Sequence, residues 1–128
     1  MSYNVYIMRI EENMFKLFQV HLSQDEVKQV NATGHDSVPK QKARLQAMIH
    51  GDPSEAIAGG FFEHVANINA DSLEDAFHVG NMGPEEKIER MPAPMHSMSV
   101  GDVVEDPEGK QWVVANVGFD AIKEKIVC

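Results

Sequence analysis

Histidine is the residue type in this sequence with the widest chemistry, because imidazole acts as acid, base or metal ligand near neutral pH. The six histidines form no HExxH pair and no other short spacing typical of metal ligands. His64, in a predicted strand, and His78, in the helix that follows, are weak candidates for a metal site, and with Asp75 they form the candidate set for a hydrolase. Because a third ligand is missing and structural histidines are much commoner, we expect no metal and no cofactor.

Carboxylate pairs are the second group with the potential for chemistry. Acid–base catalysis needs one carboxyl group in an apolar pocket and another that stays ionised. The pairs Glu11-Glu12, Glu85-Glu86 and Glu105-Asp106 fall in predicted turns, where water solvates them. Gly59-Gly60 is not followed by the Lys-Ser/Thr of a phosphate-binding loop, and neither GxGxxG nor GxSxG occurs. The sequence therefore favours a protein that is not an enzyme.

Charge is distributed unevenly along the 128 residues. The 11 Lys and Arg and the 20 Asp and Glu residues give a net charge of −9. Residues 1–50 carry a net charge of +1, and residues 51–128 carry −10. This balance argues against broad binding of nucleic-acid phosphates or of an anionic membrane, because both need a positive field. The acidic half is either a solvated face or a surface that binds a protein partner.

Cysteine usage and hydropathy favour a cytoplasmic protein. Cys128 is the single cysteine, so no internal disulfide is expected. Residues 1–13 lack the basic and apolar regions of a signal peptide. No apolar run approaches the roughly 20 residues that a membrane-spanning helix needs.

The first part of the chain predicts a hairpin followed by helices. Residues 3–10 and 14–22 are rich in β-branched and aromatic residues and predict two strands with a short polar turn between them. Ser23 and Glu26 have the spacing of a capping box, which starts a short helix. A second helix is expected over residues 39–50, with proline in its first turn and a glycine after its end.

The second part predicts a strand over 61–69, a helix that begins near Ser72, and a hairpin of strands 102–105 and 110–119. Together these elements predict a single α+β domain over residues 1–128, with an N-terminal part, 1–60, and a C-terminal part, 61–128. Its antiparallel sheet would have about five strands, formed by two hairpins and a central strand, with two or three helices packed on it.

Residues 82–98 are different in kind, because they contain three prolines and four methionines. A long connection of this composition is either a contact surface or a segment whose methionines dock onto the core, and docking is the commoner case. If the segment binds a partner, its methionines, its glutamates and the adjacent polar residues are the candidates. These candidate binding residues are Ser97, Ser99, Asp102, Met91, Met95, Met98, Glu85, Glu86 and Glu89.

One ordered pattern covers roughly residues 61–122. It comprises Glu63-His64-Val65-Ala66, Ser72-Leu73-Glu74-Asp75-Ala76-Phe77, Asn81, His96-Ser97-Met98-Ser99-Val100-Gly101-Asp102-Val103-Val104, Trp112-Val113-Val114-Ala115 and Val117-Gly118-Phe119. This pattern resembles small proteins of phages, plasmids and other mobile elements that share a YodL-like C-terminal region. The resemblance implies an accessory protein of such an element, located in the host cytoplasm, and it implies no particular activity.

Three functional hypotheses remain open at this point. The first is a non-enzymatic accessory protein whose acidic surface binds a host protein, for example to inhibit a defence protein at its basic nucleic-acid-binding site. The second is a module that binds a small molecule or nucleotide in a pocket under residues 82–98. The third is the hydrolase. The sequence does not specify the identity of the partner or the oligomeric state.

Overall fold

The computed structural model describes residues 13–123 and 125–126, and the predicted strand 3–10 lies outside them. Six strands form one sheet in the order β3-β2-β1-β4-β5-β6, with every neighbouring pair antiparallel. The strands are β1 (Met14–Val20), β2 (Phe62–Asn69), β3 (Ile88–Arg90), β4 (Val103–Glu105), β5 (Gln111–Val114) and β6 (Phe119–Ala121). The helices are α2 (Gln24–Thr33), α3 (Pro39–His50), α4 (Ser54–Ala58) and α5 (Leu73–Met82), with short 3₁₀ turns η1 (His35–Ser37) and η2 (Glu85–Lys87). The predicted α+β class is confirmed.

Strand β1 lies near the middle of the sheet, with β2 on one side and β4 on the other. Its register against β2 shifts between Leu17 and Phe18. A regular strand points successive side chains to opposite faces, and an irregularity of this kind re-aims the residues beyond it. Leu17 is completely buried and Phe18 is 1% exposed, and Gln19 is buried as well. The central strand is therefore covered on both faces.

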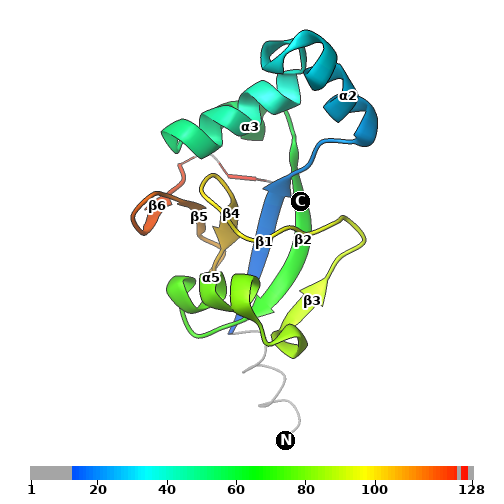
Figure 1. Ribbon diagram of the computed structural model, residues 1–128. Coiled ribbons are helices and arrows are strands. Elements are labelled where there is room, and N and C mark those ends of the chain that lie inside the picture. Colours follow the sequence, from blue (N-terminus) through cyan, green and yellow to red (C-terminus); the bar gives the residue numbers. More distant parts are fainter. Residues whose placement is uncertain (1–12, 124, 127–128) are drawn as a thin grey trace, which may run out of the picture.

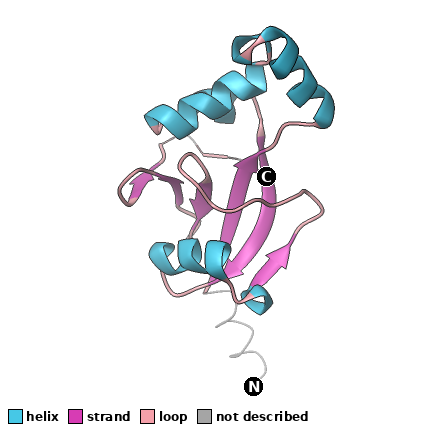
Figure 2. Cartoon of the chain, in the orientation of Figure 1, coloured by secondary structure: helices cyan, strands magenta, loops and turns pink. Residues whose placement is uncertain are grey.

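Two apolar clusters hold the helices to the sheet. In the larger one, α5 packs Ala76 and Val79 against residues of the sheet that include Leu17 and Ile68. In the smaller one, Val20 at the end of β1 contacts Ala43 of α3 and Ala56 of α4. Figures 1 and 2 show α5 across the sheet near one end of β1 and β2, with α3 crossing near the other end.

The helix ends follow their local sequence signals. The Ser23 hydroxyl accepts the Glu26 N–H at 3.1 Å, and the Glu26 carboxylate accepts the Ser23 N–H at 2.8 Å, so the predicted capping box is confirmed. Helix α3 begins at Pro39 and is followed by Gly51 in the left-handed conformation. Lys40 forms an ion pair with Glu26 at 3.0 Å, which joins the start of α3 to α2.

The predicted strand 110–119 is wrong in its length. The chain reverses over residues 115–118, so that β5 and β6 form a hairpin of their own. The Ala115 N–H donates to the Gly118 carbonyl at 3.0 Å, and Gly118 has a φ of +73°. Residues 88–90, expected in a long connection, form edge strand β3 through their pairing with β2. Four of the five predicted strands fall within the described residues, and these two corrections raise that number to the six observed.

Candidate functional site

Residues 91–101 form most of the connection between β3 and β4 and have no regular structure, and we call this segment the strap. In Figure 1 it is the yellow segment that crosses β2 and β1. Gln19 of β1 holds it with two hydrogen bonds to His96. The amide nitrogen donates to the His96 carbonyl at 2.9 Å, and the His96 N–H donates to the amide oxygen at 3.1 Å. Asn81 of α5 binds Met98 in the same way, at 3.3 and 2.6 Å. The two amides thus replace the partners that a neighbouring strand would provide.

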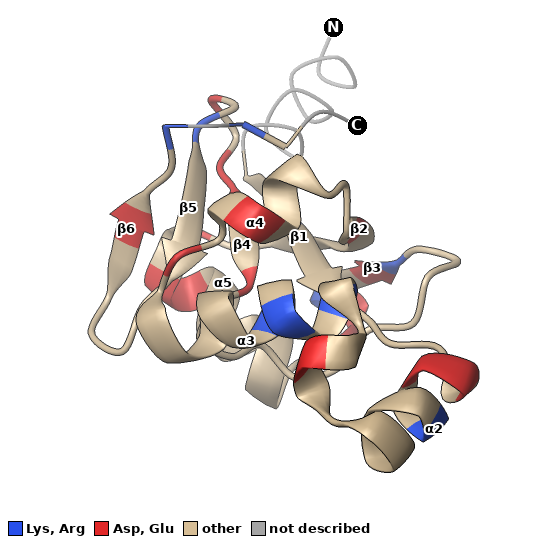
Figure 3. Ribbon diagram, turned by 90° about the horizontal axis from the view of Figure 1, so that it is seen from above, with Lys and Arg blue, Asp and Glu red and all other residues tan. Residues whose placement is uncertain are grey.

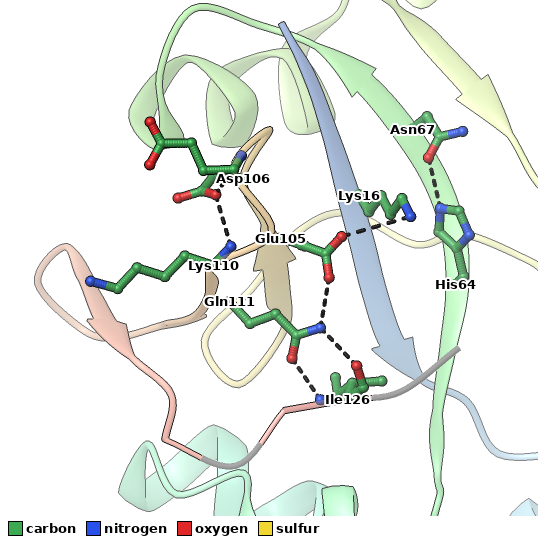
Figure 4. A network of polar contacts seen from close by, with 9 residues as sticks. Lys16, His64, Asn67, Glu105, Asp106, Lys110, Gln111 and Ile126 are labelled. Carbon is green, nitrogen blue, oxygen red and sulfur yellow. Dashed lines mark hydrogen bonds and ion pairs between the residues drawn. The ribbon is translucent and has the colours of Figure 1, made fainter. Parts of the chain in front are cut away.

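A third amide, Gln111 of β5, holds the C-terminal segment by the same arrangement (Figure 4). Its nitrogen donates to the Ile126 carbonyl at 2.9 Å, and the Ile126 N–H donates to its oxygen at 2.6 Å. The same nitrogen donates to Glu105, which also forms an ion pair with Lys16 at 3.7 Å. Side-chain amides therefore fix irregular segments to the sheet at Gln19 and Gln111 and to helix α5 at Asn81.

Beneath the strap, several parts of the chain contribute to one polar group of side chains. We call it the strap cluster, and its members are Gln19, His21, Arg44, His96 and Asp102. The Asp102 carboxylate accepts Gln19 Nε2 and the Ser99 N–H, both at 3.0 Å. Burial raises the pKa of Asp102 to about 6, although those two hydrogen bonds and nearby His96 and Arg44 act in the opposite direction.

The two histidines of the strap cluster lie side by side, with ring centroids 4.7 Å apart. His96 Nδ1 is 2.9 Å from the Ser97 carbonyl oxygen, and a carbonyl only accepts, so Nδ1 is the protonated nitrogen. The Nε2 atoms of both rings are buried and have no hydrogen-bond partner among the described residues. Burial lowers the pKa of His21, with neighbouring His96 as the second cause.

The space beside the strap cluster is too small for a substrate. A cavity of about 10 Å³, lined in part by Arg44, His96 and Asp102, has room for about one water molecule. The cluster can therefore order the strap and exchange protons, but it has no room for acid–base catalysis on a second molecule.

A larger hollow of about 420 Å³ opens between the end of α5, the η2 turn and the strap, and we call it the α5–strap hollow. Its lining includes Asn81, Arg90 and Met95. Arg90 binds the Glu85 carboxylate through two nitrogens, one at 2.5 Å and the other at 3.0 Å, and this contact lowers the pKa of Glu85. The hollow lies where a pocket under residues 82–98 was expected, and its volume is in the range of small-molecule sites.

The segments at the end of the sheet where β1 begins carry several exposed carboxylates. This end is the lower one in Figure 1. We call this surface the acidic end, and its exposed members are Asp71, Glu85, Glu86, Glu89 and Glu108. Of these five, only Glu85 forms an ion pair with another described residue. A hollow of about 520 Å³ is lined by Asp71, Asp106 and Glu108 together with Phe15. Figure 3 looks onto the opposite end, where the Lys and Arg residues of α3 are blue.

The structure separates the candidate binding residues into exposed and buried groups. Ser97 is exposed on the strap, whereas Ser99 is half-buried and donates its N–H to Asp102. Asp102 is only 6% exposed and its carboxylate bonds inward, so of these three residues it is not available to a partner at the surface.

The methionines of residues 82–98 also divide into groups. Met98 is buried in the larger core and Met95 packs against it, as expected for docking. Met91 is half-buried, whereas Met82 is 75% exposed. Met98 is therefore unable to contact a partner at the surface, while Glu85, Glu86 and Glu89 remain exposed beside the segment.

The three residues of the hydrolase hypothesis each have a separate environment. His64 Nε2 is 2.8 Å from the Asn67 side-chain oxygen, and its ring packs on Phe18 (Figure 4 shows the Asn67 contact). Asp75 accepts the Asp71 N–H at the start of α5, and His78 is exposed. Within residues 13–123 and 125–126, no group of three or more His, Cys, Asp or Glu residues is arranged to hold a metal ion.

Sequence reasoning missed the residues that organise the strap, namely Gln19, Asn81 and the His21–His96 pair. One signal was present: Gln19 stands between Phe18 and Val20 in an apolar strand, where a polar side chain needs a buried partner. Nothing local indicates which distant segment provides that partner.

Searches against protein-family models, curated proteins and solved structures find no match for this chain. Among the described residues, no helix has the length and apolar character required to cross a membrane.

Proposed function

We propose that this chain is a small non-enzymatic module that binds a basic protein surface through its acidic end. The observation that carries the proposal is the set of exposed carboxylates there, most of them without an ion-pair partner among the described residues. Complementary charge accelerates encounter and selects the partner. The resemblance to YodL-like proteins of mobile elements supports a host protein as the partner, and a defence protein with a basic nucleic-acid site has the required charge.

We expect neutralisation of the acidic end to weaken capture of the partner from a bacterial lysate. The variant Asp71→Asn, Glu86→Gln and Glu108→Gln removes three exposed charges whose side chains have no hydrogen-bond partner among the described residues. Exposed charge pairs contribute about 0.5 kcal/mol each, so the affinity should fall about tenfold. Capture is quantified by mass spectrometry over a range of salt concentrations, followed by titration with the purified partner.

The matched control changes the same number of charges elsewhere, at Asp25, Asp36 and Glu55, and should bind like the wild type. Equal capture by both variants, or capture that does not weaken with salt, would contradict a role of the acidic end. Recovery of no partner at low salt would count against a protein-binding module altogether.

A second candidate function is the binding of a small anionic molecule, such as a nucleotide, in the α5–strap hollow. The observation that favours it is the volume of about 420 Å³ beside the Arg90 guanidinium, which is half exposed. An anionic group in the hollow would compete with Glu85 for Arg90, because guanidinium binds carboxylate and phosphate through the same two-pronged geometry.

Thermal unfolding with a panel of nucleotides and signalling molecules tests this candidate. A ligand at about 100 times its dissociation constant adds about 2.7 kcal/mol, which raises the unfolding midpoint by several degrees. Arg90→Gln should abolish the rise, while Lys28→Gln, which neutralises an exposed cation on α2, should preserve it. No rise for any compound of the panel would remove the candidate.

A further inference from the structure

The strap is held closed from below by the strap cluster. Gln19 links the His96 backbone to Asp102, and Asp102 binds the Ser99 backbone three residues further along. The only histidine on the strap, His96, lies against His21, the residue that follows β1. Titratable side chains thus stand at the point where the segment is attached to the sheet. We propose that the strap is a pH-sensitive latch, closed while His21 is neutral and released when His21 takes up a proton.

The geometry of the two rings supports the proposal. The Nε2 atom of His21 is buried and has no hydrogen-bond partner among the described residues, so a proton added there creates an unpaired donor, although the Pro94 carbonyl partly favours the charged ring. The neighbouring His96 ring, with its centroid 4.7 Å away, also disfavours a positive charge on His21. Release of the strap relieves both penalties, because water then reaches the rings.

The charged groups around the rings come from each neighbouring element. Arg44 of α3 adds a positive charge near His21 and Asp102, whereas Glu63 of β2 faces His21 with a negative charge. The combined effect favours the neutral ring, since the pKa of His21 is lowered, with burial as the largest cause and His96 as the next. Asp102 is the remaining charge, and burial raises its pKa to about 6.

Histidine and aspartate therefore act in opposite directions as the pH falls. His21 binds a proton less readily in the closed form than in the open form, so its contribution to closure is full above its ordinary pKa of 6.5 and is lost as the pH falls from there through the lowered pKa of the closed form. Asp102 binds a proton more readily in the closed form, so its protonation favours closure as the pH falls from about 6 toward the ordinary 3.8. Single substitutions separate the two effects.

Release of the strap also changes the surface of the molecule. Residues 95–97 form one wall of the α5–strap hollow, and His96 lines both this hollow and the small cavity of the strap cluster. Opening the latch would remove that wall. The inference stands independently of the proposed binding functions, because it concerns the strap alone.

Hydrogen exchange of the backbone amides in the full chain, at pH 7.5, 6.5 and 5.5, tests the latch. After correction for intrinsic rates, the protection of the His96 and Ser99 amides in Asp102→Asn should fall as the pH drops below 6.5, by up to about tenfold per pH unit for the one proton taken up by His21. The asparagine keeps an oxygen that accepts from Gln19 and Ser99 but does not titrate. Amides in the middle of β1 and β2 should keep their protection, which shows that the fold is intact.

His21→Phe keeps a ring against His96 and removes one titration, so the loss of strap protection at low pH should shrink or reverse. His78→Gln, at an exposed histidine, is the control and should behave like the wild type. The latch is refuted if strap protection in Asp102→Asn is independent of pH, or if His21→Phe loses protection as the wild type does. Should His21→Phe fail to fold, the NMR titration of His21 in the wild type decides, because a midpoint at or above 6.5 overturns the proposal.

Discussion

Replacement of Gly101 by alanine is expected to destabilise the fold by about 2–5 kcal/mol. Gly101 ends the strap with a φ of +94°, a conformation that costs other residues about 1–2 kcal/mol. A Cβ atom there would lie 2.8 Å from the carbonyl carbon of Ala47 and 2.9 Å from the Met48 nitrogen. These are backbone atoms of α3, which move only with the helix, so overpacking adds about 1–3 kcal/mol. Urea unfolding followed by circular dichroism measures the loss.

Gly34→Ala provides the matched control for this prediction. Gly34 has nearly the same φ, +92°, but no atom lies within 4 Å of its added Cβ. Its substitution should therefore cost only the conformational part, about 1–2 kcal/mol. If Gly101→Ala and Gly34→Ala lower the free energy of unfolding by the same amount, the close approach of the strap to α3 adds nothing to the cost of Gly101→Ala. The contact between the strap and α3 would then be looser than described.

Replacement of Gln19 by leucine is expected to cost about 3 kcal/mol or more. Leucine fills a similar space in β1 but leaves the His96 N–H, the His96 carbonyl and Asp102 without the partner that each has in the wild type. A buried polar group without a partner costs about 1–3 kcal/mol. The free energy of unfolding falls accordingly, and hydrogen exchange should locate the loss in the strap.

Gln111→Leu is the comparison for Gln19→Leu, because Gln111 is also buried and makes the same pair of bonds, here to Ile126. Lys125 is exposed and Ile126 only half-buried, so the Ile126 backbone can turn to water when the amide is lost, and the cost should be smaller. Exchange should then increase around residue 126 and leave the strap protected. Unchanged stability of Gln19→Leu would show that the amide is not what holds the strap.

Several features of this protein are determined by the sequence alone. The capping box at Ser23 and Glu26 and the turn after β4 depend on residues at most four positions apart. In that turn the Gly109 N–H donates to the Asp106 carbonyl at 2.9 Å, as the Pro-Glu-Gly pattern predicts. The pattern of hydrophobic residues was also sufficient to predict the α+β class. The count of charged residues was sufficient to identify the C-terminal part as acidic.

Other features were decided only by the tertiary structure. Strand β3 exists because β2 offers an open edge, and β6 exists because the chain reverses after β5. Asp102, one of the candidate binding residues, is buried, and its partner Gln19 stands 83 positions earlier in the chain.

The physical reason for this division is the range of the interactions. Caps and turns satisfy backbone groups with neighbours in the sequence, so a short window contains both partners. A buried amide such as Gln19 or Asn81 signals only that a partner is required. Which segment provides it depends on how the sheet and α5 bring the strap within hydrogen-bond distance, and that is settled only when the whole chain is packed.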